Sequence, residues 1–93
     1  MKATWHGQTL AESDDTTEVD GYHYFPRASV REDVLIDSPK TTSCAWKGQA
    51  NYYSIIVDGD VLDDAAFFYG EPKPGAADQV GDRIAFWKDV VVS

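Results

Sequence analysis

The sequence predicts a mostly β, small single-domain fold: an antiparallel barrel-like or tent-like sheet with one or two short helical turns. Gly-containing turns recur at short intervals, and the segments between them are rich in Thr, Val, Ile, Tyr, Phe and Trp, which favour strands. The chain of 93 residues is long enough for one domain with a modest core. No linker or internal repeat divides it, so we expect a single domain over residues 1–93.

Three Gly-containing turns predict three strand pairs. The first pair lies within residues 3–13 (ATWHGQTLAES), the second within 16–25 (TTEVDGYHYF) and the third within 55–61 (IIVDGDV). An Asp-Gly turn between apolar flanks fits a type I′ turn, which needs positive φ at both central residues. A last strand is predicted within residues 83–93 (RIAFWKDVVVS).

Two stretches interrupt this β pattern. Ser29 and Glu32 have the spacing of a capping box, which predicts a helical turn from about Val30 to Leu35. Residues 72–82 (PKPGAADQVGD) begin with two prolines and a glycine, so they predict a loop that leads into one helical turn.

Residues 41–55 (TTSCAWKGQANYYSI) are predicted to form a central strand and its entry turn. Within residues 50–57, alternate positions point to opposite faces of a sheet, and both sets are largely apolar or aromatic. A strand of this kind is covered on both sides, which places it in the middle of the core.

The charge and composition exclude several classes of function. The net charge is −8, with sixteen acidic against eight basic residues, so we expect neither nucleic acid nor an anionic membrane surface as a partner. A single cysteine cannot form an internal disulfide or a zinc site built from CxxC pairs. The acidic residues lack the spacing of a calcium loop, so we expect no metal and no cofactor. Without a recognisable signal peptide or an apolar run of about 20 residues, we expect a soluble, cytoplasmic protein.

Three side chains are candidates for catalysis, and each has a structural alternative. Lys47 is either a cation at the edge of an aromatic pocket, where desolvation would lower its pKa, or a solvated turn lysine beside Gly48. Cys44 is either a thiolate activated by Lys47 or His23, or a small buried apolar side chain. His23 is either a general base or a polar-face residue of a strand.

The aromatic residues are the largest signal, because they exceed what a domain of this size needs to fill its interior. Our lead hypothesis is a pocket that binds a small molecule or an anion, with tyrosine hydroxyls and one lysine as its polar groups. The predicted pocket residues are Tyr24, Trp46, Lys47, Tyr52 and Tyr69. One alternative is an enzyme of unassigned reaction that uses the three catalytic candidates. Another is a homodimeric interaction module that buries the surplus aromatic residues.

The order of the segments WHGQTLAES, YHYFP, TTSCAWKGQANYYSI, AAFFYGEPKPGAA and RIAFWKDVVV resembles the domain of unknown function 427 family of small bacterial and fungal proteins. That family typically shows a Cys-Pro-Trp-Lys-Gly run followed by a Tyr-Tyr pair. The matching residues here are Cys44, Trp46, Lys47, Gly48, Tyr52 and Tyr53. Ala45 stands where the family usually has proline, and Phe67 stands near a position where tryptophan is common.

The resemblance implies a compact β-rich fold, barrel-like or tent-like, and no established activity. The family's label has sometimes pointed to nucleotidyl transfer. The sequence does not support that function, because it lacks a Gly-Ser pair followed by spaced catalytic aspartates and a G-x-x-x-x-G-K-[ST] phosphate loop.

Overall fold

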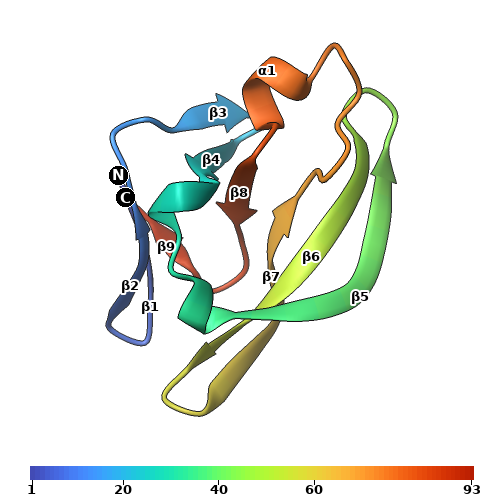
Figure 1. Cartoon of the computed structure of the whole chain (residues 1–93). Coiled ribbons are helices and arrows are strands. Elements are labelled where there is room, and N and C mark those ends of the chain that lie inside the picture. The colour runs from blue at the N-terminus through green and yellow to red at the C-terminus, as the bar shows by residue number, and fades with distance from the viewer.

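A computed structural model describes all of residues 1–93, which form two antiparallel sheets (Figure 1). The smaller sheet has the strand order β2-β1-β9, and the larger has the order β3-β4-β8-β7-β6-β5. The strands are β1 (Lys2–Trp5), β2 (Gln8–Glu12), β3 (Thr17–Val19), β4 (Tyr22–Pro26), β5 (Leu35–Cys44), β6 (Gly48–Val57), β7 (Asp60–Phe68), β8 (Arg83–Phe86) and β9 (Val91–Val92). The predicted mostly β, antiparallel fold is confirmed, although the two sheets are not closed into a barrel.

The three predicted hairpins are confirmed, and each turns through two residues with positive φ. This is the backbone geometry of a type I′ turn, whose twist matches that of the flanking strands. The φ values are 52° and 73° at His6-Gly7, 54° and 86° at Asp20-Gly21, and 53° and 83° at Asp58-Gly59.

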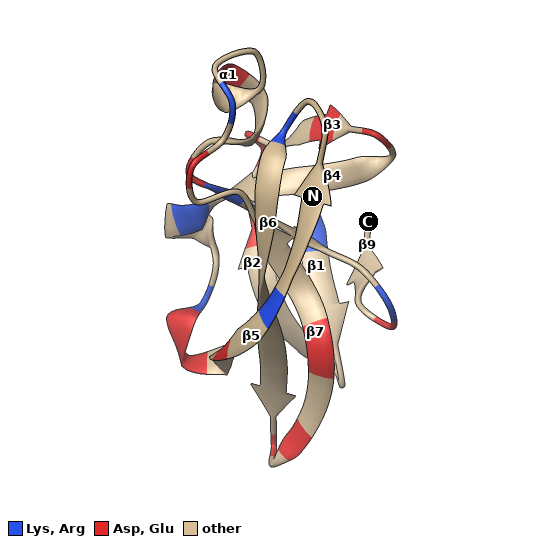
Figure 2. Cartoon of the chain, turned by 90° about the vertical axis from the view of Figure 1, so that its right-hand side faces the viewer, with Lys and Arg blue, Asp and Glu red and all other residues tan.

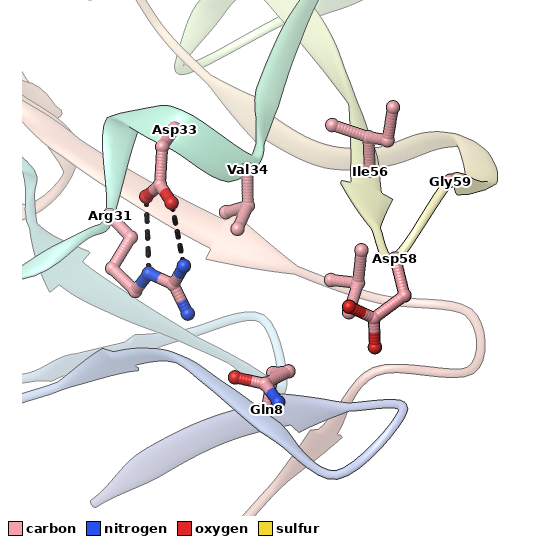
Figure 3. Close-up of a pocket in the computed structure, with 8 residues that line it drawn as sticks. Gln8, Arg31, Asp33, Val34, Ile56, Asp58 and Gly59 are labelled. Carbon is pink, nitrogen blue, oxygen red and sulfur yellow. Dashed lines mark hydrogen bonds and ion pairs between the residues drawn. The ribbon is translucent and has the colours of Figure 1, made fainter.

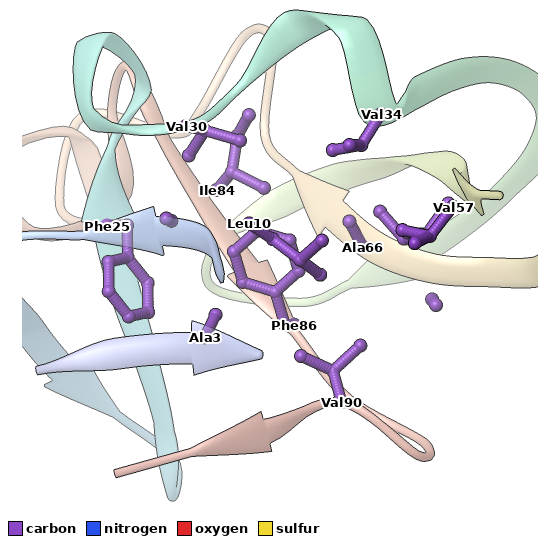
Figure 4. Close-up of a cluster of buried hydrophobic side chains, with 13 residues drawn as sticks. Ala3, Leu10, Phe25, Val30, Val34, Val57, Ala66, Ile84, Phe86 and Val90 are labelled. Carbon is purple, nitrogen blue, oxygen red and sulfur yellow. The ribbon is translucent and has the colours of Figure 1, made fainter. Parts of the chain in front are cut away.

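The larger sheet buries residues on both of its faces, and each face has its own cluster. The first core cluster fills the space between the two sheets and includes Leu10 of β2 and Phe25 of β4 (Figure 4). The second core cluster includes Tyr24 of β4 and Phe67 of β7, and Val80 of α1 (Ala77–Val80) covers it. Tyr24 and Phe25 enter different clusters because successive residues of a strand point to opposite faces.

The prediction that residues 50–57 lie in the middle of the core is wrong in one respect. These residues belong to β6, which lies one position from the sheet edge because β5 pairs with its outer side. The expected alternation holds, since Ile55 enters the first core cluster and Ala50 the second. The side chains of β6 are not equally buried, however, since Ile56 is only half-buried.

The predicted capping box is wrong, although a helical turn does form in the expected range. The 3-10 turn η2 (Glu32–Val34) follows Arg31 without a capping side chain. Ser29 Oγ instead donates to the Pro26 carbonyl at 2.7 Å, within the separate 3-10 turn η1 (Arg27–Ser29). The second predicted turn is confirmed as α1.

None of the helices has the length and apolar character needed to span a bilayer.

Phe25 is expected to make a large contribution to stability, because its side chain is fully buried in the first core cluster. Replacing Phe25 with Ala should lower the free energy of unfolding by about 3–5 kcal/mol through lost burial and the cavity left behind. Val61→Ala is the control, since Val61 is 49% exposed and its truncation should cost less than about 1 kcal/mol. Urea unfolding followed by circular dichroism measures both values, and equal losses would contradict the assigned core.

Candidate functional site

A row of paired residues across the larger sheet builds the floor of the candidate site. Tyr24 of β4 pairs with Ala85 of β8, Ala85 with Phe67 of β7, and Phe67 with Tyr52 of β6. Paired residues point to the same face, so the three rings lie side by side above the sheet. The ring centroid of Phe67 lies 5.9 Å from those of both Tyr24 and Tyr52. Ala85 carries only a methyl group, so the Tyr24 and Phe67 rings can meet edge to face above it.

This row borders a cavity of about 160 Å³, referred to below as the aromatic cavity. Its lining residues are Tyr22, Lys47, Tyr52, Phe67, Tyr69 and Trp87. Phe67 is 7% exposed and meets the rings of Tyr22 and Trp87 edge to face, with centroids 5.2 and 6.5 Å apart. Tyr22 is 37% exposed, so the cavity opens to solvent on its side.

Lys47 is positioned by the turn between β5 and β6, which packs against the loop after β7. Gly48 has a φ of 109°, and a Cβ at this position would lie 3.3 Å from the Glu71 carbonyl oxygen, so the two segments approach closely. The Lys73 backbone N–H donates to the Lys47 carbonyl at 3.0 Å, and Lys73 Nζ donates to the Ala45 carbonyl at 2.7 Å. These contacts hold the turn in place from two sides.

The Lys47 side chain is buried and paired with a carboxylate. Lys47 Nζ lies 3.0 Å from Asp20 Oδ2, and 5.3 and 5.6 Å from the ring centroids of Tyr69 and Trp46. Burial lowers the pKa of Lys47, but the hydrogen bond to Asp20 and the charges of Tyr24 and Tyr69 outweigh it and raise the pKa above its usual range. Lys47 is therefore an ammonium at neutral pH. The expectations of a lowered pKa and of a solvated turn lysine are both wrong.

The Tyr24 hydroxyl is buried and makes no hydrogen bond of good geometry, although Lys47 and Tyr69 lie close enough to influence its pKa. Burial raises the pKa of Tyr24 to about 12, against the opposing influence of the Lys47 ammonium. A buried polar group without a partner is rare in folded proteins and costs about 1–3 kcal/mol. This hydroxyl is therefore an unmet hydrogen-bonding position beside Lys47 and Tyr69.

The structure brings some of the predicted pocket residues together and separates others. Lys47, Tyr52 and Tyr69 line the aromatic cavity. Tyr24 lies in the same cluster, with no exposed surface. Trp46 is 41% exposed and does not line the cavity.

Four residues of the site were not assigned to the pocket from the sequence. Tyr22 alternates with Tyr24 along one strand, so period-two patterning would have placed it on the same face. Phe67 and Trp87 were recognised as aromatic, but their place beside the lysine depends on strand order. Asp20 was read only as a turn residue, and nothing in the sequence marks it as the partner of a lysine 27 positions away.

An irregularity in β7 fixes the position of Trp87. The register between β6 and β7 shifts between Tyr53 and Ile55, and Asp64 on β7 has a positive φ of 53°. The Asp64 backbone N–H donates to Ser54 Oγ at 3.1 Å, and its carbonyl accepts a hydrogen bond from the Trp87 indole. The bulge therefore anchors one wall of the aromatic cavity.

The other two catalytic candidates are not brought together. The backbone N–H groups of Lys47 and Trp46 lower the pKa of the Cys44 thiol, which is half-buried against the second core cluster. His23 points to the opposite face of β4 from the cavity, and its Nε2 lies 3.7 Å from Glu18 Oε2. His23 is therefore not placed to activate Cys44.

A larger surface cavity, of about 390 Å³, lies between β2, η2 and the β6–β7 turn, and no predicted site residue lines it (Figure 3). Its cation is already engaged, since Arg31 Nε and Nη2 contact the two Asp33 carboxylate oxygens at 3.1 and 2.6 Å. No group of three or more His, Cys, Asp or Glu side chains is arranged to hold a metal ion.

Comparison with known families identifies the chain. A family model described as a domain of unknown function (DUF427) matches residues 1–93, so the chain belongs to this family. A search of curated proteins found no match. The motif at residues 44–53, which carried the resemblance, supplies Lys47 and Tyr52 to the aromatic cavity.

Replacing Asp20 with Asn tests the buried ion pair. The variant keeps a side chain that tolerates positive φ but leaves the Lys47 ammonium without its carboxylate, so the free energy of unfolding should fall by about 1–3 kcal/mol. Asp58→Asn is the matched control, because Asp58 occupies the same kind of turn with φ of 53° against 54°. Urea unfolding at pH 7 compares the two, and losses of the same size would exclude a stabilising role for the pair.

The raised pKa values of Lys47 and Tyr24 predict a loss of stability at alkaline pH. Both groups begin to lose protons in the unfolded chain at about pH 10, before they do so in the folded state. Stability linked to them is complete below pH 10 and falls as the pH rises toward 12. Urea unfolding between pH 8 and about 11.5 measures the decline, and a flat profile would contradict the shifts.

Tyr24→Phe separates the tyrosine from the lysine. The variant removes the unpaired hydroxyl, so its stability at pH 7 should equal or exceed that of the wild type, and its alkaline decline should be shallower. Tyr53→Phe is the control, because the Tyr53 hydroxyl accepts a hydrogen bond from Arg27 Nη1 at 3.0 Å, and its loss should cost about 0.5–1.5 kcal/mol. A Tyr24→Phe protein less stable than the control would show that the hydroxyl is satisfied in solution.

Proposed function

We propose that the chain is a cytoplasmic small-molecule binding domain that takes a single planar ring into the aromatic cavity. The observation that carries this proposal is the cavity itself, which has five aromatic residues and one buried lysine as its walls. Rings of this kind supply large flat contact surfaces with few rotatable bonds, and tyrosines add a polar tip to each.

The volume of the cavity limits the ligand. Sites for drug-sized ligands usually measure about 300–1,000 Å³, whereas an apolar cavity of about 150 Å³ holds one benzene molecule. The aromatic cavity, at about 160 Å³, is close in volume to the cavity that holds one benzene molecule. A ligand would therefore insert one ring and extend its remaining atoms past Tyr22 toward solvent.

Lys47 and the tyrosine hydroxyls supply the polar contacts. An ammonium has three N–H donors, and Lys47 uses one of them on Asp20. The hydroxyls of Tyr24 and Tyr69 lie near the other donors, so an acceptor atom on the ligand's ring would share the ammonium with them. Because Asp20 balances the charge of Lys47, this lysine is suited to donating a hydrogen bond and less suited to binding an anion on its own. The Tyr52 hydroxyl lies 3.0 Å from Thr42 Oγ1, which fixes its direction.

The enzyme and homodimer hypotheses have less support. A lysine held as an ammonium by Asp20 is a poor base or nucleophile, and His23 lies on the other face of β4. The exposed edge of β5 is interrupted by Pro39, Lys40 and a register shift, features that oppose pairing with a second edge strand.

Benzamide is a suitable neutral probe, because its one ring fits the cavity volume. Its addition should shift the Trp87 indole signal in ¹H–¹⁵N spectra and leave that of Trp5 unchanged, with about millimolar affinity. Tyr22→Ala should weaken binding about two- to tenfold by removing one ring contact. Trp46→Ala is the matched control, since Trp46 is similarly exposed but does not line the cavity. The absence of any Trp87 shift, or equal weakening by both variants, would refute ring binding at this cavity.

A further inference from the structure

Three of the five lysines lie beside rings that line the aromatic cavity. Lys40 Nζ lies 5.0 Å from the Tyr52 ring centroid and 5.7 Å from that of Trp87. Lys88 Nζ lies 5.3 Å from the Trp87 centroid, and Lys47 is itself a lining residue. Ammonium groups at these distances are attracted to the negative faces of the rings. Positive charge is therefore concentrated at this one place.

These lysines cluster beside the cavity although the chain as a whole is negatively charged. The net charge is −8, and acidic segments are spread over β7 and the turns, whereas β5 carries Lys40 as its one basic residue (Figure 2). The overall field of such a chain attracts cations and repels anions. The lysines beside the aromatic cavity place ammonium groups against the cavity's rings in spite of this overall charge.

The three lysines differ in how far their charges are already balanced. Lys47 is paired with Asp20. Lys88 Nζ donates to the Asp63 carbonyl, which satisfies one N–H without cancelling the charge. Lys40 Nζ makes no hydrogen bond and no ion pair, and its side chain is exposed. Lys40 is thus the free cation beside the cavity.

We propose that the ligand is a single-ring aromatic carboxylate, whose ring enters the aromatic cavity and whose carboxylate is bound by Lys40. This inference rests on the proposed ring-binding function and adds the charge of the ligand to it. Lysine is a mobile point charge on a four-carbon stem, and Lys40 Nζ already lies against Tyr52 and Trp87, so it can reach a carboxylate on a ring held beside these two walls. Asp37, Asp63 and Asp64 lie with Lys40 around a neighbouring surface cavity, and their negative charges oppose the binding of a carboxylate there.

A cationic ligand is the main competitor, because aromatic residues around a cavity also bind ammonium groups. Here the chain's own ammonium groups already lie against Tyr52, Tyr69 and Trp87. A ligand cation would meet like charges at each of these rings, which costs free energy where an anion would gain it. The local arrangement therefore favours the anion, although the net charge favours the cation.

Three probes of similar size and different charge test this inference: benzoate, benzamide and benzylamine. Titration of ¹⁵N-labelled protein at low salt, followed at the Trp87 indole, should give the affinity order benzoate, then benzamide, then benzylamine. The expected preference for benzoate over benzamide is about three- to tenfold, as for one exposed ion pair, and it should shrink at 0.5 M salt. Benzylamine binding most tightly would overturn the inference, as would equal affinities for all three probes.

Lys40→Gln should remove the preference for benzoate over benzamide. Lys2→Gln is the control for net charge, because Lys2 lies in the small sheet and approaches Glu12 at 4.0 Å. A benzoate preference that survives Lys40→Gln, or that Lys2→Gln abolishes equally, would overturn the role of Lys40. The two proposals fail separately: binding of benzamide without a benzoate preference refutes only the charge inference, whereas no Trp87 shift with any probe refutes ring binding as well.

Discussion

The larger sheet buries residues on both faces, and the unequal cover on those faces shapes the rest of the molecule. One face is closed by a second sheet built from the two ends of the chain. Lys2 and Ser93 exchange backbone hydrogen bonds of 2.8 and 2.9 Å, which bring these ends together. The other face has only one short helical turn and a loop to cover it. Aromatic side chains must therefore cover one another there, and these rigid rings leave a cavity between them.

The same incomplete cover explains how a charged lysine is tolerated among these rings. A buried ammonium without a partner would lose its hydration and shift toward its neutral form. Lys47 avoids this because the β3–β4 turn places Asp20 within 3.0 Å of it. Asp20 is itself half-exposed, so water continues to solvate the pair from one side. The charge is thus stabilised by a residue from a different hairpin, and the site depends on how the two hairpins pack.

Sequence patterns predicted the features that depend on residues close together in the chain. The His6-Gly7 and Asp58-Gly59 turns follow directly from local backbone preferences, and so do the strands on either side of them. The motif around Lys47 also pointed to a real cavity wall. The capping box failed because Ser29 belongs to the separate turn η1, where its hydroxyl donates to the Pro26 carbonyl and does not cap the turn that follows Arg31.

Features that depend on long-range pairing were beyond prediction. Tyr22, Phe67 and Trp87 line one cavity only because β4 and β7 both pair with β8, and no local pattern specifies that order. The burial of Lys47 also depends on long-range packing, because the turn residues around it would by themselves predict a solvent-exposed side chain. The structure also gives Phe67 a position in the cavity that could not be inferred from the sequence around it. It stands near a position where the family commonly has tryptophan, and in this chain it forms the base of the cavity. A larger indole at that point would occupy part of the space above the sheet, so the residue at this position sets how deeply a ring can enter.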